Sequence, residues 1–157
     1  MVLVVPASER DVPALRALGV RTWRATYAGV LPGADVERGV DELFNPYSVA
    51  TAVRDGRMLA AFRDGLLVGM LEFDRVDDAR TMIWKLYVDP DAQSRGIGGL
   101  LLERLLQSAT TPEVRVEHDE RNAGAAAFFT GFGFAVDEVV DAGGGARTVR
   151  LVRRLRP

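Results

Sequence analysis

The chain of 157 residues contains no cysteine, and His118 and Lys85 are its only histidine and its only lysine. Without cysteine, disulfide bonds, thiolate metal sites and a thiol nucleophile are all excluded. One histidine cannot form a zinc site that needs several, and we expect no metal. The other basic residues are arginines, which we interpret as compositional bias.

Long hydrophobic runs are also missing. The chain nowhere has the roughly 18 consecutive apolar residues that a membrane span needs. Its apolar opening, residues 1–5, stops at Pro6 and is too short for a signal peptide. The formal net charge of -2 gives no electrostatic reason to expect a nucleic acid partner. We therefore expect a cytoplasmic protein that binds neither membrane nor nucleic acid.

Length and composition fit one globular domain. Hydrophobic residues make up 48% and charged residues 27% of the chain, an ordinary balance for a folded protein. A chain of this length can bury one core. We predict a single domain over residues 1–157.

The spacing of apolar residues and breakers predicts a mixed α/β fold. Strands are expected over residues 2–5, 57–63, 66–75, 81–88, 114–118, 134–140 and 147–155. Helices are expected after Asp11 as N-cap, after Pro46, over residues 96–108 and after Asn122, with a loop and a short helix over residues 27–45. Asp64-Gly65 is typical of a hairpin turn, and Trp23 and Trp84 are expected in the core.

A glycine-rich turn between an expected strand and an expected helix is the clearest candidate site. Gly96 and Gly98 let a ligand approach the backbone, and successive N–H groups from Gln93 onward would meet a phosphate at the helix N-terminus. Arg95 could add a charged contact. A P-loop is excluded because no glycine here precedes a lysine, and a dinucleotide motif lacks its third glycine. A plain strand-to-helix connection stays equally open on the glycines alone.

Two motifs resemble the GNAT superfamily of N-acetyltransferases. The first is Val88-x-Pro90-x-x-Gln93-x-Arg95-Gly96-x-Gly98 followed by three leucines, which is similar to the family's acyl-CoA motif. The second is Asn122-x-x-Ala125-x-x-Phe128-Phe129 followed by Gly133-Phe134. The order of elements agrees over nearly the whole chain. The resemblance implies a single GNAT-like domain with a splayed, mostly antiparallel central sheet of about seven strands flanked by helices.

The resemblance also implies a cosubstrate and a reaction. Acetyl-CoA would donate an acetyl group directly to a primary amine: a small amine, an amino-acid derivative, or a protein N-terminus or lysine. Loops 26–46 and 142–147 would shape the acceptor site, and a homodimer paired through sheet edges is expected. The turn amides would bind the CoA pyrophosphate, and the strand before them would pair with the pantetheine arm. The residues so assigned to CoA are Leu86, Tyr87, Val88, Gln93, Ser94, Arg95, Gly96, Ile97, Gly98, Gly99, Asn122 and Phe128.

The chain departs from the family pattern at two positions that often supply acid or base. Phe129 stands where a tyrosine often protonates the leaving thiolate, and Met82 stands where a glutamate often acts as base. A non-catalytic acyl-CoA sensor or regulatory module is therefore the alternative function. A nucleotide-binding domain that uses the same turn is a weaker one.

Three side chains could replace the missing groups. His118 ends the strand that should border the thioester, and an imidazole exchanges protons near neutral pH. Glu72 could attract or deprotonate a cationic amine, and Tyr27 could reach the acceptor site as an acid. Each has a structural alternative: a half-buried histidine, a solvent-facing polar strand edge and a packing aromatic.

Overall fold

The computed structural model describes residues 1–93 and 95–156 and divides into two compact units. The first unit comprises Met1–Glu72 and Lys85–Leu105, and the second comprises Phe73–Trp84 and Leu106–Pro157. Each unit is described by itself below. None of the helices in the described chain is long and apolar enough to cross a membrane.

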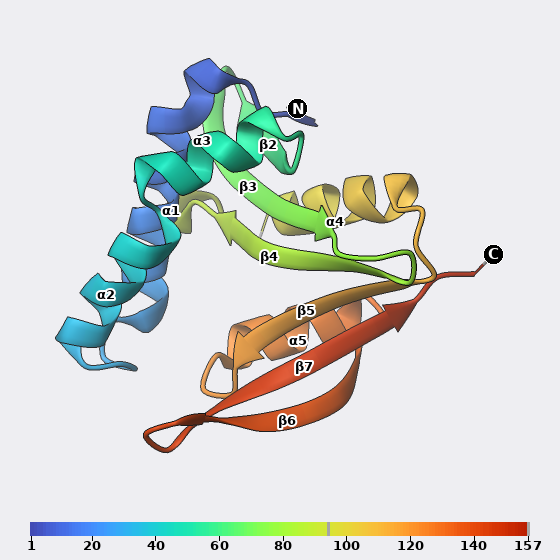
Figure 1. The fold of residues 1–157 in the computed structure, drawn as a ribbon. Helices are drawn as coiled ribbons and strands as arrows, with labels where there is room; N and C mark the ends of the chain where they lie inside the picture. Colours follow the sequence, from blue (N-terminus) through green and yellow to red (C-terminus); the bar gives the residue numbers. More distant parts are fainter. Residues whose placement is uncertain (94, 157) are drawn as a thin grey trace. The chain divides into compact units, whose positions relative to one another are not determined.

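The first unit holds the N-terminal elements and the glycine-rich turn (Figure 1). Its elements are β1 (Val2–Pro6), the 3-10 turn η1 (Glu9–Asp11), α1 (Val12–Tyr27), α2 (Gly33–Leu43), α3 (Pro46–Arg54), β2 (Met58–Arg63), most of β3 (Leu66–Arg75), the end of β4 (Arg80–Val88), the 3-10 turn η2 (Pro90–Ala92) and most of α4 (Ile97–Ser108). The second unit holds the start of β4, β5 (Glu113–Asp119), α5 (Ala123–Gly131), β6 (Ala135–Gly143) and β7 (Ala146–Arg154).

The strands follow the order β1-β2-β3-β4-β5-β7-β6, which confirms the expected sheet. The β4–β5 pair is parallel, while β1–β2, β2–β3, β5–β7 and β6–β7 are antiparallel. Parallel pairing runs only from Arg80 opposite Glu113 to Ile83 opposite Val116. Both strands continue beyond these residues, β4 to Val88 and β5 to Asp119. The pairing therefore ends midway, as the predicted splay requires.

The structure confirms the expected helices and strands. It corrects the length of α2, the role of the Asp11 side chain and the burial of Trp84. The short helix expected within residues 27–45 is the eleven-residue α2. Asp11 is the N-cap residue of α1, but its carboxylate makes no hydrogen bond to the helix; it accepts from the backbone N–H and the hydroxyl of Ser8, at 2.8 and 3.0 Å. Trp84 is not in the core but 49% exposed. Its strand neighbours Ile83 and Lys85 are buried, and alternation turns the indole to the other face.

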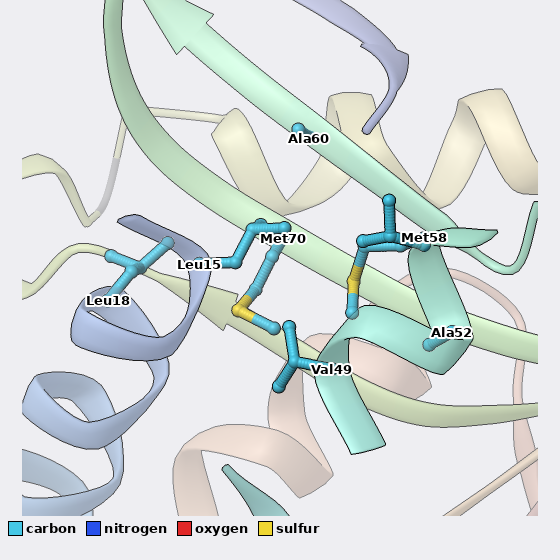
Figure 2. Packing of buried hydrophobic residues seen from close by; sticks show 8 residues of the cluster. Leu15, Leu18, Val49, Ala52, Met58, Ala60 and Met70 are labelled. Carbon is cyan, nitrogen blue, oxygen red and sulfur yellow. The ribbon is translucent and has the colours of Figure 1, made fainter. Parts of the chain in front are cut away.

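The core of the first unit packs α1 and α3 against β2 and β3 (Figure 2). The side chains of Met58 and Met70 point from the strands toward Val49 of α3, and Leu15 and Leu18 of α1 belong to the same cluster. The buried members of this core are Leu15, Leu18, Val49, Ala52, Val53, Met58, Ala60 and Met70. Each fully buried Leu, Val or Met side chain contributes about 1.5–3 kcal/mol, so this packing holds α1 and α3 on the strands.

Close packing of α1 predicts a stability effect at Gly19. A Cβ at Gly19 would lie 2.2 Å from Cε1 of Phe44, whose ring is 1% exposed and cannot move aside. Gly19→Ala should lower the free energy of unfolding by about 1–3 kcal/mol, measured by chemical denaturation. Gly33→Ala in α2 is the matched control, since no atom lies within 4 Å of its Cβ position. A Gly19 variant as stable as the control would contradict this packing.

Candidate functional site

The start of the glycine-rich turn is fixed from two sides within the first unit. The Asp89 N–H donates to the Val68 carbonyl of β3 at 2.8 Å, and the Asp89 carboxylate accepts from the Asp91 N–H at 3.0 Å. The same carboxylate forms an ion pair with Arg21 of α1. Pro90 then opens η2, where its fixed φ fits the first position of a helical turn. The path of the backbone into the turn is therefore set by β3 and α1.

The backbone of β4 offers its free edge at Val88. Because the Asp89 N–H points to β3, the N–H and C=O of Val88 point away from β3, and by the same alternation so do those of Leu86. The Val88 carbonyl already accepts from Gln93 Nε2 at 3.0 Å and from the Thr22 hydroxyl at 3.4 Å. The Val88 N–H and the Leu86 backbone thus face the direction in which an added strand would pair.

The turn ends at the N-terminus of α4. Gly96 has a φ of +77°, a conformation that favours glycine, and no atom lies within 4 Å of its Cβ position. The first helical hydrogen bond runs from the Leu100 N–H to the Gly96 carbonyl at 3.1 Å, so the amides of Ile97, Gly98 and Gly99 precede it. Such amides bind anions. Arg95 is exposed beside them, whereas Ser94 lies outside the described residues.

The second motif lies at the start of α5 in the second unit. Asn122 caps the helix: its Oδ1 accepts from the Ala125 N–H at 3.0 Å. The Phe128 ring packs against Phe129 and Phe132, with centroids 5.1 and 5.0 Å away. Phe129 is 5% exposed and also meets Phe134. The aromatic pair of the motif is thus part of an apolar cluster, and Phe129 has no proton to give.

His118 lies on β5, two residues beyond the end of the β4–β5 pairing. It is 9% exposed, on the strand face that also buries Val114 and Val116. Its Nδ1 lies 2.7 Å from the Asp119 carbonyl oxygen. Its Nε2 is buried, and no residue of the described chain offers it a hydrogen-bond partner. Buried polar atoms without partners are rare in native proteins.

The Asp119 carboxylate beside this imidazole is engaged elsewhere. Hydrogen bonds from the Arg121 guanidinium, at 2.7 and 2.8 Å, are the main cause that holds the pKa of Asp119 below its ordinary value. The carboxylate therefore stays ionised at neutral pH and is bound to Arg121. Glu117 points to the other face, where it pairs with Arg150 at 2.9 Å.

Glu72 lies in a buried ion cluster with Lys85 and Arg57, not at the solvent-facing edge that was its structural alternative. The Lys85 ammonium donates to Glu72 Oε1 at 3.0 Å and to the Leu43 carbonyl at 2.5 Å. Arg57 lies 3.7 Å from the other oxygen of Glu72. Sequence analysis missed Lys85 and Arg57 as site residues. The sequence did contain a signal for this contact: Lys85 is the only lysine of the chain, and it lies on the strand that follows and neighbours the strand of Glu72.

The first unit also contains two tyrosines of interest, the candidate Tyr27 and Tyr87 of β4. Tyr27 is 8% exposed and packs on Trp23, with ring centroids 4.4 Å apart. Tyr87 packs against the core and meets Phe44 at 5.5 Å. Burial first, and then the charges of Tyr27 and Glu72, raise the pKa of Tyr87 far above its ordinary value. Its phenol therefore keeps its proton at neutral pH.

Comparisons with known proteins agree with these features. Residues 20–134 match the acetyltransferase (GNAT) family. A probable N-acetyltransferase of Mycobacterium tuberculosis is 30% identical over an alignment of 132 residues that covers 81% of this chain and 76% of the relative. Among solved structures, the PaiA N-acetyltransferase of Thermoplasma acidophilum in complex with coenzyme A superposes with a TM-score of 0.88 at 20% identity and 99% coverage of both chains. The ribosomal-protein-S18-alanine N-acetyltransferase of Escherichia coli gives 0.74 at 18% identity and covers 98% of this chain and 94% of its own. These two structures share the fold of this chain.

Proposed function

Because this chain belongs to the GNAT family as an acetyl-CoA-dependent N-acetyltransferase, we propose that it transfers the acetyl group directly to a primary amine. The observation that carries the proposal is the turn between β4 and α4. It combines a left-handed Gly96, helix N-terminal amides that precede the first intrahelical bond, and a β4 edge that points away from β3. Amides at a helix N-terminus can bind a pyrophosphate, and an unpaired strand edge can pair with a pantetheine arm.

In this proposal the CoA binds mainly to backbone atoms. The pyrophosphate would accept hydrogen bonds from the amides of Gln93 and of Arg95 to Gly99, and Arg95 would add a charged contact. The pantetheine arm would pair with the Val88 N–H and the Leu86 backbone, since the Val88 carbonyl is already engaged. Asn122 would offer its amide NH₂, because its Oδ1 caps α5. Phe128 would pack beside the arm.

The three candidate catalytic side chains have different surroundings. The Glu72 carboxylate forms ion pairs with Lys85 and Arg57, so we propose that it stabilises the first unit and does not act in catalysis. Tyr27 is packed on Trp23, and we assign it to the wall of the acceptor site. Of the three, only His118 has a buried side-chain atom, Nε2, that forms no hydrogen bond within the described residues. Direct attack by a bound amine gains most of its rate from positioning, and proton transfer adds about 10²–10⁴-fold.

Calorimetric titration of the purified chain with acetyl-CoA and with CoA tests the binding step. We expect saturable binding of both ligands, and ATP should not displace CoA. A screen of primary amines at saturating acetyl-CoA, with free thiol as the readout, then tests transfer. Tight CoA binding without thiol release from any amine would favour the sensor or regulatory module that Phe129 and Met82 first suggested. A preference for ATP over CoA would overturn the proposal.

The state and location of the chain are also part of the proposal. The edge strands of the sheet are β1 and β6, and β6 exposes Val136 and Val139. We propose that the chain forms a homodimer through a sheet edge and works in the cytoplasm. Light scattering coupled to size-exclusion chromatography should give twice the mass of the 17.1 kDa chain, and a monomer would contradict the pairing.

A further inference from the structure

The Nε2 atom of His118, on β5 in the second unit, is buried and has no hydrogen-bond partner in the described chain. Within residues 1–93 and 95–156, it is the one buried side-chain nitrogen or oxygen without a hydrogen-bond partner. A buried polar group without a partner is destabilising, so a histidine that only packs would normally have both ring nitrogens satisfied. An atom in this state is suited to a partner that arrives with a ligand.

The other ring nitrogen sets the chemical form of the imidazole. A backbone carbonyl can only accept, so at 2.7 Å from the Asp119 oxygen Nδ1 must carry the hydrogen. In a neutral ring Nε2 is then an unprotonated acceptor. The local backbone therefore presents the basic nitrogen of the ring and holds its orientation, as a carbonyl or carboxylate does for many functional histidines.

His118 lies on β5 beyond the part of the strand that pairs with β4. Beyond Val116 the strand keeps its pairing with β7, where His118 is opposite Val149, but its pairing with β4 has ended. The ring lies on the buried face, away from the Glu117–Arg150 ion pair. The described chain thus leaves this acceptor atom without a hydrogen-bond partner, two residues beyond the last β5 residue that pairs with β4.

We infer that His118 carries the proton in acetyl transfer, as base at its Nε2 and then as acid. This inference rests on the proposed function and on the expectation from the sequence that the strand ending at His118 borders the thioester. The neutral amine attacks the thioester carbon and forms the C–N bond, and Nε2 takes the proton that the nitrogen loses. The C–S bond then breaks, and the imidazolium returns that proton to the thiolate. The products are the acetamide and CoA thiol, with His118 restored. One residue thereby replaces the acid that Phe129 cannot supply and the base absent at Met82.

Because the chain has a single histidine, nuclear magnetic resonance can test the tautomer directly. In protein labelled with ¹⁵N-histidine, long-range ¹H–¹⁵N correlations at neutral pH should show hydrogen on Nδ1 and none on Nε2. Addition of CoA should shift the Nε2 resonance, with binding followed by calorimetry on the same sample. A hydrogen on Nε2 in the free protein would overturn the inference. CoA binding that leaves Nε2 unchanged would overturn it while the proposed function stands, and absence of CoA binding would overturn the proposed function itself.

Substitution tests the same nitrogen in turnover, with acetyl-CoA and the first amine acetylated in the screen. His118→Asn keeps an N–H that can reach the Asp119 carbonyl but has no group at Nε2. We expect kcat to fall about 10²–10⁴-fold while the Kd for CoA and the melting temperature stay near those of the wild type. His118→Ala should lose a similar factor and regain activity with added imidazole. A His118→Asn variant with kcat within a few-fold of the wild type would show that Nε2 carries no proton.

Discussion

Lys85→Met should lower the free energy of unfolding by about 3–5 kcal/mol, the loss typical of breaking a buried ion pair on one side. The Lys85 and Glu72 side chains are only 6% and 11% exposed, so water screens their interaction little. Removal of the ammonium would leave the Glu72 carboxylate with Arg57 alone, at 3.7 Å. It would also leave the Leu43 carbonyl, at the end of α2, without its donor. A domain of this size loses roughly 2–4 °C of melting temperature for each kcal/mol.

Two further variants separate the buried charge from general effects of the substitution. Lys85→Met combined with Glu72→Gln should recover part of the loss, because the orphaned carboxylate is then neutral. Arg24→Met breaks the Arg24–Glu37 pair, of similar length at 2.9 Å but with both side chains more than half exposed, and should hardly change the melting temperature. Thermal unfolding followed by circular dichroism measures all three. If Lys85→Met melted like Arg24→Met, the ion cluster would contribute nothing to stability.

The fold could be predicted from the sequence where local rules act alone. The Asp64-Gly65 hairpin is formed by two residues with φ of 52° and 78°, as the dipeptide predicts. Pro46 after the capping Asn45 opens α3, and Asn122 caps α5. Trp84 shows the limit of such rules, because residue type favoured burial and strand alternation decided exposure.

Within the candidate site, only the part formed by backbone atoms could be predicted from the sequence. The glycine spacing predicted a turn and the helix that follows, and the structure gives the left-handed conformation to Gly96 and not to Gly98. The role of Glu72 depends on Lys85, thirteen residues away on the neighbouring strand. The ammonium of Lys85 in turn binds the carbonyl of Leu43 in α2. Such contacts come from tertiary packing, which no local pattern encodes. The free Nε2 of His118 likewise depends on the backbone path at Asp119.

Gly96→Val should weaken CoA binding by about 100-fold or more while the chain still folds. The φ of +77° costs a β-branched residue about 1–3 kcal/mol, and the exposed turn can relax that strain in the free protein. Binding must then restore the strained conformation, which corresponds to roughly 10–100-fold in Kd. The valine side chain adds to the loss, because the open space at the Gly96 Cβ is where the pyrophosphate would approach. Calorimetric titration with CoA gives the ratio of dissociation constants.

The same substitution at Gly56 distinguishes a ligand effect from backbone strain alone. Gly56 joins α3 to β2 with a φ of +71°, and it too has no atom within 4 Å of its Cβ position. Gly56→Val should therefore lower stability yet leave the Kd for CoA unchanged. Gly96→Asn separates strain from bulk, because asparagine tolerates the left-handed region. It should bind CoA better than Gly96→Val but more weakly than the wild type. Equal affinity of the wild type and Gly96→Val would place the pyrophosphate elsewhere, since no ligand that contacts these amides could ignore a side chain at Gly96.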